Sequence, residues 1–262
     1  MKNLLSKAIE AAYKGGLEIL DVYDSDFAVE TKDDKSPLTL ADKRAHNKIM
    51  EVLGTTKLPV LSEEGKSIDY EERAKWDRFW MVDPLDGTKE FVKRNGEFTV
   101  NIALIQNGKS IGGVIYVPVK RDMYFGAIDL GSYKKENYSG DVFEWDQLTA
   151  ESAKLPHSGP SDRYRAVGSR SHMSPETEDF FNQLKKEHGE IEVVSMGSSL
   201  KICLVAEGAA DIYPRFAPTM EWDTAAGHAI AKGAGKNITD HETKSEMVYN
   251  KTNLLNNWFV VN

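Results

Sequence analysis

The fold of this chain is decided by the stretch WMVDPLDGTKEF, residues Trp80–Phe91. An apolar run, Phe79–Val82, leads directly into Asp83 and Pro84, and this pattern predicts a strand that runs into a turn. Proline fixes its own φ and has no backbone donor, so we expect strand pairing to stop at that point. The glycine at position 87 permits a tight bend or a close approach of the backbone.

Oxygen-bearing side chains follow the predicted end of this strand. Asp83 and Asp86 supply two carboxylates, and Thr88 supplies a hydroxyl just beyond Gly87. Oxygen ligands of this kind suit a hard cation such as Mg²⁺. The fragment alone is explained equally well by two common surface turns, Asp-Pro and Asp-Gly, so its interpretation depends on the rest of the chain.

The length and net charge of the chain limit the classes of protein to which it can belong. The 262 residues are 40% hydrophobic and 28% charged, which suits one large domain or two lobes with a sizeable core. The net charge of −8, from 33 Lys and Arg against 41 Asp and Glu, argues against non-specific nucleic-acid binding, which needs a basic surface. The same charge would repel an anionic substrate unless bound cations reverse the field locally.

The single cysteine, Cys203, excludes an internal disulfide and fits a reducing compartment. It lies in an apolar helical stretch, where we expect a buried structural thiol. We find no signal peptide and no apolar run long enough to span a membrane, so we expect a cytoplasmic protein. Peripheral attachment to the cytoplasmic face of the inner membrane is left open by the sequence.

The pattern of apolar residues predicts two lobes, with a boundary within residues 141–160. The first half predicts a helix at 3–23, a helix from Thr39 to Leu53, and exposed polar residues at 131–140. It also predicts an antiparallel meander with strands at 98–105, 111–119 and 123–127. The second half alternates strands and helices, which indicates an α/β lobe. Its strands are expected at 163–167, 191–194, 210–214 and 258–261, and its helices at 175–188, 200–207 and 223–234.

Three further segments supply carboxylates. Asp42 follows Thr39, a predicted N-cap, so a capping-box role is the simpler interpretation, and orienting a metal-bound water is the alternative. Glu63 and Glu64 follow a short strand, and neighbouring side chains on extended backbone point to opposite faces, so we expect one of them to face inward. Asp223 lies at or near a predicted helix N-terminus, either as a cap or as a metal ligand.

One glycine and two serines, Gly197, Ser198 and Ser199, lie between a predicted strand and a predicted helix. Backbone N–H groups at such a position can hold an anion, although a plain helix N-cap explains the same three residues. The six histidines are scattered, and none has zinc-site spacing with another histidine or with the cysteine. The sequence signatures of P-loop, dinucleotide-binding and serine-hydrolase sites are missing.

Taken together, these segments resemble a known family. Glu63–Glu64, Asp83–Thr88 and Trp222–Asp223, in that order, resemble the lithium-sensitive, magnesium-dependent phosphatase superfamily that includes the inositol monophosphatases. The strings at residues 36–42, 61–64, 86–91 and 197–201 resemble one branch of it, the CysQ-type 3'(2'),5'-bisphosphate nucleotidases. One departure is Ala217 before Pro218, where we expect a glycine.

The resemblance implies a two-lobed, layered αβαβα sandwich of the inositol monophosphatase type. Residues 1–150 would form an N-terminal α+β lobe with most of the metal ligands, and residues 151–262 a C-terminal α/β lobe with substrate-side residues and one metal ligand. The implied activity, part of sulfur metabolism, is hydrolysis of 3'-phosphoadenosine 5'-phosphate (PAP) to AMP and phosphate by direct attack of a metal-activated water. The alternatives are an inositol monophosphatase or sugar bisphosphatase with the same metal chemistry, and a catalytically silent scaffold.

The resemblance also assigns roles to individual residues. Two or three Mg²⁺ ions would be held by Glu63, Asp83, the Leu85 carbonyl, Asp86 and Asp223. Asp42 and Thr88 would orient the attacking water. Glu64 would lie next to the metal ligands without binding the metal itself. A small phosphate ester would contact Glu63, Leu85, Asp86 and Asp223, together with Gly87, Thr88, Gly197, Ser198, Ser199, Lys201 and Arg215. Metal ions suit this reaction because they provide a nucleophile at neutral pH, neutralise the phosphoryl oxygens and stabilise the leaving group.

Overall fold

The structure is a computed structural model that describes residues 1–25, 37–159, 161–168 and 174–262. The short strand predicted near Ala28 lies outside the described residues. So do Ser36, the first residue of the string at 36–42, and Ser169–His172, which follow a predicted strand.

A mixed sheet forms the centre of the molecule. Its seven described strands lie side by side in the order of the sequence; the first two pair in parallel and the other neighbours are antiparallel. The predicted antiparallel meander is therefore confirmed. The strands are β1 Val60–Ser62, β2 Arg78–Asp86, β3 Thr99–Gln106, β4 Lys109–Val117, β5 Asp122–Ala127, β6 Gly131–Lys135 and β7 Ala153–Lys154.

The prediction that residues 131–140 are exposed holds for Glu136, Asn137 and Ser139 and is wrong for the rest of the segment. β6 extends the meander by one strand, and in this segment Ser132 and Tyr138 are almost fully buried. Lys134 has the appearance of a surface residue in the sequence, but its ammonium group lies 3.4 Å from the buried carboxylate of Glu207. The polar sequence did not indicate this strand, because Glu207, the partner of Lys134, comes from a helix that is distant in the sequence.

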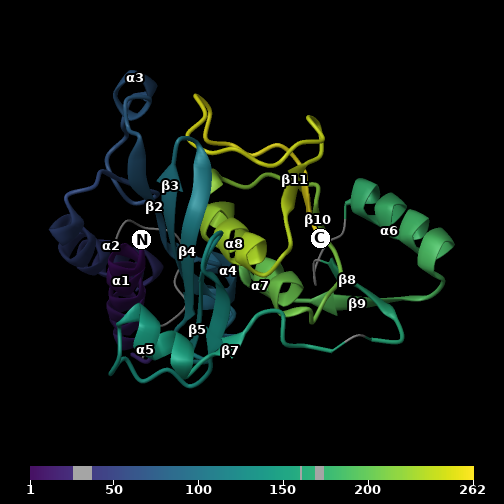
Figure 1. Ribbon diagram of the computed structural model, residues 1–262, viewed down its shortest axis with the longest axis horizontal. Coiled ribbons are helices and arrows are strands. Elements are labelled where there is room, and N and C mark those ends of the chain that lie inside the picture. The colour runs from purple at the N-terminus through teal and green to yellow at the C-terminus, as the bar shows by residue number, and fades with distance from the viewer. Residues whose placement is uncertain (26–36, 160, 169–173) are drawn as a thin grey trace.

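Helices cover both faces of the sheet. α1 (Lys2–Tyr23) and α2 (Pro37–Leu53) pack on one face, while α8 (Glu221–Gly233), with α7 (Leu200–Glu207) beside it, packs on the other (Figure 1). α8 approaches β4 very closely, since a Cβ atom at Gly113 would lie 2.1 Å from the Ala226 carbonyl oxygen. A glycine is therefore needed at this position for α8 to dock.

Smaller sheets and one helix form the outer layers beyond α7 and α8. β8 (Tyr164–Gly168) pairs in parallel with β9 (Ile191–Ser195), and β12 (Phe259–Val261) pairs between β10 (Tyr213–Arg215) and β11 (Ile238–Asp240). α6 (Pro175–His188) packs against β8, β9 and β10 at the outer end of the molecule (Figure 1). The order of layers is that of the predicted αβαβα sandwich.

Several predicted boundaries can be compared with the structure. The helices predicted at 175–188 and 200–207 match α6 and α7 residue for residue. α2 begins at Pro37, so Thr39 lies in its first turn and the predicted N-cap there is wrong. The division into lobes at residue 150 stays a prediction; β7, just beyond that point, pairs with β6 of the central sheet.

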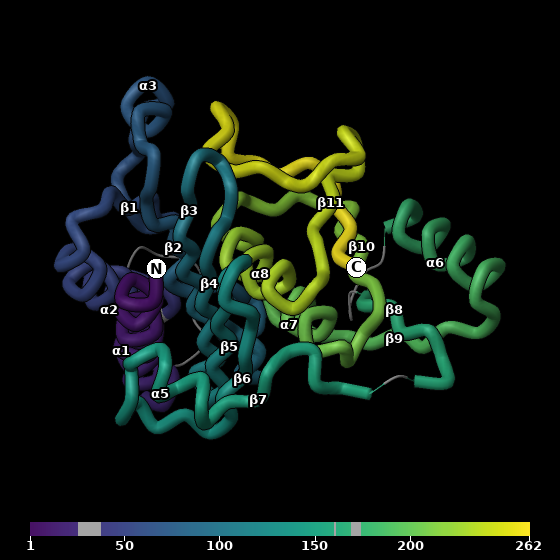
Figure 2. The backbone as a smooth tube through the Cα atoms, in the orientation of Figure 1, coloured from purple at the N-terminus to yellow at the C-terminus, as the bar shows by residue number. Residues whose placement is uncertain are grey.

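The C-terminal part of the chain crosses back over α8. In Figure 2 it runs, in yellow, across one end of the molecule between β11 and the tips of the central strands. Near those tips the backbone N–H of Tyr249 donates to the carbonyl of Gly108, in the turn between β3 and β4, at 2.9 Å. This crossing brings residues 250–256 against the beginning of α8, whose first turn carries Asp223.

Candidate active site

The central motif forms the end of β2. Pairing with β3 is interrupted after Asp83, which lies opposite Asn101, and it resumes at Asp86, which lies opposite Thr99. The irregularity falls on Pro84, as expected for a residue without a backbone donor. The strand continues beyond it, however, so the prediction that pairing ends there is wrong.

The bulge holds two carboxylates at the C-terminal end of β2, the buried Asp83 and the half-buried Asp86. Asp83 is almost fully buried, and its Oδ1 accepts the backbone N–H of Leu85 at 3.0 Å. Oδ2 of Asp86 accepts the backbone N–H of Ser199 at 2.6 Å and the side-chain amide of Asn101 at 3.3 Å. Buried charges persist only with such partners, so both carboxylates are held in defined orientations.

The turn after β2 brings two distant segments together. Gly87 has a φ of +94° and precedes the short helix α4 (Thr88–Val92), which confirms the predicted tight bend. A Cβ atom at this position would lie 3.1 Å from Cβ of Ser198. Gly87 and Thr88 therefore face the turn that leads into α7.

Asp223 lies in the first turn of α8, as predicted. Its Oδ2 accepts the backbone N–H of Met220 at 2.8 Å, so it closes the N-terminus of the helix from the third helical position. Its location at a helix N-terminus favours a negative charge. Burial and repulsion from Asp86 nevertheless raise the pKa of Asp223 above its ordinary value.

Asp42 has no capping role. It lies inside α2, almost fully buried, and within the described residues its Oδ1 has no hydrogen-bond partner. Burial, together with repulsion from Glu64 and Glu63, raises the pKa of Asp42 to about 8. The capping-box interpretation is therefore wrong, and the structure places Asp42 beside the other carboxylates.

Asp42, Glu63, Asp83, Asp86 and Asp223 form one carboxylate cluster. Burial raises the pKa of Asp83 well above its ordinary value, and Asp86, Glu63, Asp223 and Asp42 each raise it further by repulsion. Burial likewise raises the pKa of Asp86. Glu63 is exposed, but partial desolvation and repulsion from Asp86 still raise its pKa.

The donor set of this cluster fits a hard cation. All its members are carboxylates, their charges oppose one another, and one buried oxygen of Asp42 is left without a donor among the described residues. A bound divalent ion would remove that repulsion. In the described part of the chain no three His, Cys, Asp or Glu side chains are already arranged as a metal cage, so ligation requires some of these side chains to move.

A cleft of about 780 Å³ opens beside the carboxylate cluster. Asp42, Glu63, Glu64, Asp83 and Leu85 do not line this cleft. Asp83 and Glu63 are close enough to Asp86, which does line it, for its charge to raise their pKa values. The predicted site residues that do line it come from both halves of the chain. They are Asp86, Gly87, Thr88, Gly197, Ser198, Ser199, Lys201, Arg215 and Asp223.

The predicted anion site at the start of α7 already has protein acceptors. The backbone N–H of Gly197 donates to Oε2 of Glu97 at 2.8 Å, and that of Ser199 donates to Asp86. A phosphate group approaching these two donors would therefore compete with carboxylates of the protein.

Two cationic side chains lie on the same wall of the cleft. Nζ of Lys201 donates to the Met196 carbonyl at 3.3 Å, and desolvation lowers its pKa, with nearby Asp86 opposing that shift. Arg215 donates to the carbonyl of Pro218 at 3.2 Å, while its Nε, buried, has no partner among the described residues. Both residues line the cleft, so their positive charges lie beside it.

Sequence reasoning missed two residues of the site. Asn101, buried in β3, donates to Asp86 and accepts the Ser199 hydroxyl at 2.9 Å. A polar side chain inside an apolar strand needs a partner, and that was the available signal. Glu97 carried no such signal, because it lies in a turn rich in charged residues and its contact with Gly197 spans 100 positions.

The layered sandwich and the carboxylate cluster define a class of metal-dependent phosphatases. The model of the "Inositol monophosphatase family" matches residues 1–258, and the chain belongs to this family. Within it, the chain is 45% identical over 246 residues to 3'(2'),5'-bisphosphate nucleotidase CysQ of Salmonella typhimurium and 46% identical over 245 residues to that of Escherichia coli K12. Each alignment covers 92% of this chain and 92% of the relative.

Solved structures show the same likeness. A crystal structure of CysQ from Bacteroides thetaiotaomicron, described as a bacterial member of the inositol monophosphatase family, is 52% identical with a TM-score of 0.95, covering 100% of this chain and 97% of that one. Inositol monophosphatase II from Staphylococcus aureus shares the fold at 20% identity, with a TM-score of 0.76 and coverage of 100% and 91%. Separately, none of the described helices is long and apolar enough to cross a membrane.

Proposed function

We propose that this protein is a Mg²⁺-dependent phosphomonoester hydrolase that converts PAP to AMP and phosphate. The observation that carries the proposal is the carboxylate cluster, with raised pKa values, beside a cleft that Lys201 and Arg215 line. The names of the relatives in Salmonella and Escherichia coli, both bisphosphate nucleotidases, support the choice of substrate.

The carboxylate cluster would hold the metal ions. Glu63, Asp83, Asp86 and Asp223, with the carbonyl oxygen of Leu85, are the ligands we propose for two or three Mg²⁺ ions. Bound Mg²⁺ lowers the pKa of water and neutralises charge on the phosphoryl group. Without that neutralisation, the net charge of −8 and the cluster itself would repel a bisphosphate.

Asp42 and Thr88 would orient the attacking water. Asp42 has an oxygen without a protein donor within the described residues, so it can accept a proton from water at that position. Desolvation, and after it repulsion from Glu64, raises the pKa of Asp42 to about 8. A nearby cation would lower this pKa. Glu64 is exposed and would act through Asp42 and the metal ligands, without contact to substrate.

The remaining cleft residues would bind the substrate. Gly87, Thr88 and the turn at Gly197–Ser199 lie where a phosphate next to Asp86 would meet them. Lys201 and Arg215 would bind the second phosphate, and this requirement favours a bisphosphate over inositol monophosphate. A sugar bisphosphate would satisfy the same cations, so it remains the alternative substrate that the site accommodates.

A catalytically silent scaffold is the alternative from another class. Such a protein need not keep five carboxylates that repel one another, two of them buried, because each unneutralised buried charge lowers stability. Their assembly therefore favours an enzyme. We also propose a cytoplasmic location, since the single Cys203 is a buried free thiol; nothing in the comparisons supports peripheral membrane attachment.

The decisive experiment measures phosphate release with Mg²⁺ from PAP, inositol 1-phosphate and fructose 1,6-bisphosphate side by side. We expect phosphate to be released faster from PAP than from the other two substrates. We expect this release to be lost in Asp83→Asn. Preference for inositol 1-phosphate or for the sugar bisphosphate would overturn the proposed substrate and keep the metal chemistry. No release from any of the three, with no binding of Mg²⁺ at millimolar concentration, would support the scaffold.

A further inference from the structure

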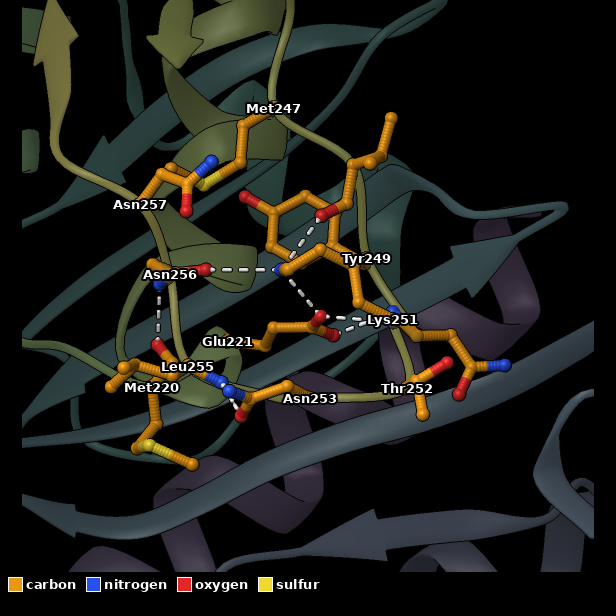
Figure 3. A network of polar contacts seen from close by, with 12 residues as sticks. Met220, Glu221, Met247, Tyr249, Lys251, Thr252, Asn253, Leu255, Asn256 and Asn257 are labelled. Carbon is orange, nitrogen blue, oxygen red and sulfur yellow. Dashed lines mark hydrogen bonds and ion pairs between the residues drawn. The ribbon is translucent and has the colours of Figure 1, made fainter. Parts of the chain in front are cut away.

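The first turn of α8, which carries Asp223, is bonded to the C-terminal segment 250–256 (Figure 3). Glu221 is fully buried, and its Oε2 accepts the backbone N–H of Asn250 at 2.5 Å. Its Oε1 accepts both the backbone N–H and the Nζ group of Lys251, at 3.0 and 2.6 Å. This carboxylate therefore has three donors, all from the segment that crosses α8.

A second side chain of the segment spans the same turn. The amide group of Asn256, almost fully buried, donates to the Met220 carbonyl at 2.8 Å (Figure 3). The same nitrogen lies within hydrogen-bond distance of the hydroxyls of Thr219 and Thr224, at 3.2 and 3.1 Å. These acceptors lie on both sides of Asp223 in the sequence. Met220 also donates its N–H to Asp223, so the network reaches the proposed metal ligand through one residue.

The segment itself is anchored to the other half of the chain. Arg73, almost fully buried in α3 (Tyr70–Arg73), donates to the side-chain carbonyl of Asn250 at 2.8 Å and to the backbone carbonyls of Lys251 and Thr252 at 2.7 and 2.8 Å. Asn250 returns a bond to the Arg73 carbonyl at 2.8 Å. The segment is thus a fixed support for α8.

We propose that Lys251 and Asn256 are positioning residues for Asp223. Through Glu221 and Met220 they set the first turn of α8 and thereby the position of the Asp223 carboxylate beside Asp86 and Glu63. The inference rests on the proposed function, because it takes Asp223 to be a metal ligand. Partners that orient metal ligands in this way commonly contribute about ten- to a hundredfold to metal affinity.

A purely electrostatic role of Lys251 predicts the opposite result. Removing its positive charge makes the surroundings of the cluster more negative, which would tighten the binding of Mg²⁺. A purely structural role predicts lower stability with unchanged metal affinity. Only a positioning role predicts weaker Mg²⁺ binding in a folded protein.

The test measures Mg²⁺ binding to the full chain by titration calorimetry, with no substrate present. We expect Lys251→Met and Asn256→Leu each to raise the Kd for Mg²⁺ by about tenfold, and Lys251→Arg to stay within about twofold of the wild type. The matched control is Lys134→Met, which also removes a lysine from a buried glutamate, Glu207, but lies away from the cleft. We expect it to lower the melting temperature and leave the Kd unchanged.

The outcomes separate this inference from the proposed function. If the wild type binds Mg²⁺ and both variants bind it equally well, the positioning role is overturned and the proposed function stands. If the wild type binds no Mg²⁺, the positioning role and the proposed function are both overturned. If Lys251→Met does not fold, Asn256→Leu decides, and a Kd within twofold of the wild type in that variant overturns the proposal. As an independent readout, the KM for PAP at saturating Mg²⁺ should be unchanged in the variants.

Discussion

The backbone N–H of Ser199 donates a 2.6 Å hydrogen bond to Oδ2 of Asp86, across 113 positions of the chain. The bond joins the N-terminus of α7 to the end of β2, and the positive end of a helix dipole favours the negative charge there. One oxygen of Asp86 is thus stabilised by the protein, while the other remains available to the cluster.

This bond leads to the prediction for Asp86→Asn. The amide can still accept the Ser199 N–H through its oxygen, but it carries no charge for a cation. We expect phosphate release from PAP to fall by about a hundredfold or more, since metal catalysis contributes several kcal/mol. Circular dichroism should show an unchanged fold. Full activity in this variant would exclude Asp86 as a metal ligand.

Asp42→Asn should separate stability from activity. Its buried carboxylate has a pKa of about 8 and an oxygen without a donor among the described residues, so it opposes folding at high pH. We expect the metal-free variant to be more stable than the wild type at pH 8 by a few kcal/mol, because one pKa unit corresponds to about 1.4 kcal/mol. Phosphate release should be nearly abolished. A less stable variant would show that the carboxylate has a partner in solution.

The metal-free protein should lose stability as the pH rises. Asp42 binds its proton more tightly in the folded state than in the unfolded state, with a pKa of about 8 against an ordinary value of 3.8. Between these values the folded state holds more protons, so the free energy of unfolding falls as the pH increases from about 4 to 8. The raised pKa values of Asp83 and Asp223 act in the same direction.

Melting temperatures in EDTA across this pH range measure the effect. Saturating Mg²⁺ should remove most of the slope, because bound cations favour the ionised carboxylates. The stabilisation by Mg²⁺ should therefore increase from pH 5 to pH 8. Asp42→Asn serves as the control, and its slope in EDTA should be shallower. A melting temperature that is flat or rises with pH would contradict the raised pKa values.

Glu97→Gln should improve substrate binding. Oε2 of Glu97 accepts the Gly197 N–H at 2.8 Å, and its charge lies close enough to Lys201 to affect that lysine's pKa. The neutral isostere keeps the hydrogen bond and no longer repels a phosphate. We expect the KM for PAP to fall by about three- to tenfold with a similar kcat, since one screened unit charge at short range contributes on the order of 1 kcal/mol. A higher KM would show that Glu97 binds substrate.

Lys201→Met should change substrate preference. If Lys201 binds the second phosphate, its loss should raise the KM for PAP by about tenfold or more, the range for a hydrogen bond to a charged group. Any hydrolysis of inositol 1-phosphate, which has one phosphate, should change little. Arg215→Met provides the matched test of the other cation. An equal loss on both substrates would place Lys201 at the scissile phosphate.

Local sequence determined much of this protein. The apolar runs predicted the meander from β3 to β5, and the alternation in the second half predicted α6 and α7 to the residue. The motif at Asp83–Thr88 identified the metal-ligand candidates, because a carboxylate pair at a strand end is a local pattern. These features depend on residues close together in the chain, so the sequence alone predicts them.

The tertiary structure decided which of the available partners each polar group uses. Asp42 appeared to be a cap in the sequence, and Lys134 a surface residue. Asp42 is buried and Lys134 half-buried, each beside charges from remote elements. The contacts of Ser199 with Asp86 and of Glu97 with Gly197 likewise join the two halves. Burial and long-range pairing set the pKa values and bond partners of these groups, and neither is encoded in the spacing of neighbouring residues.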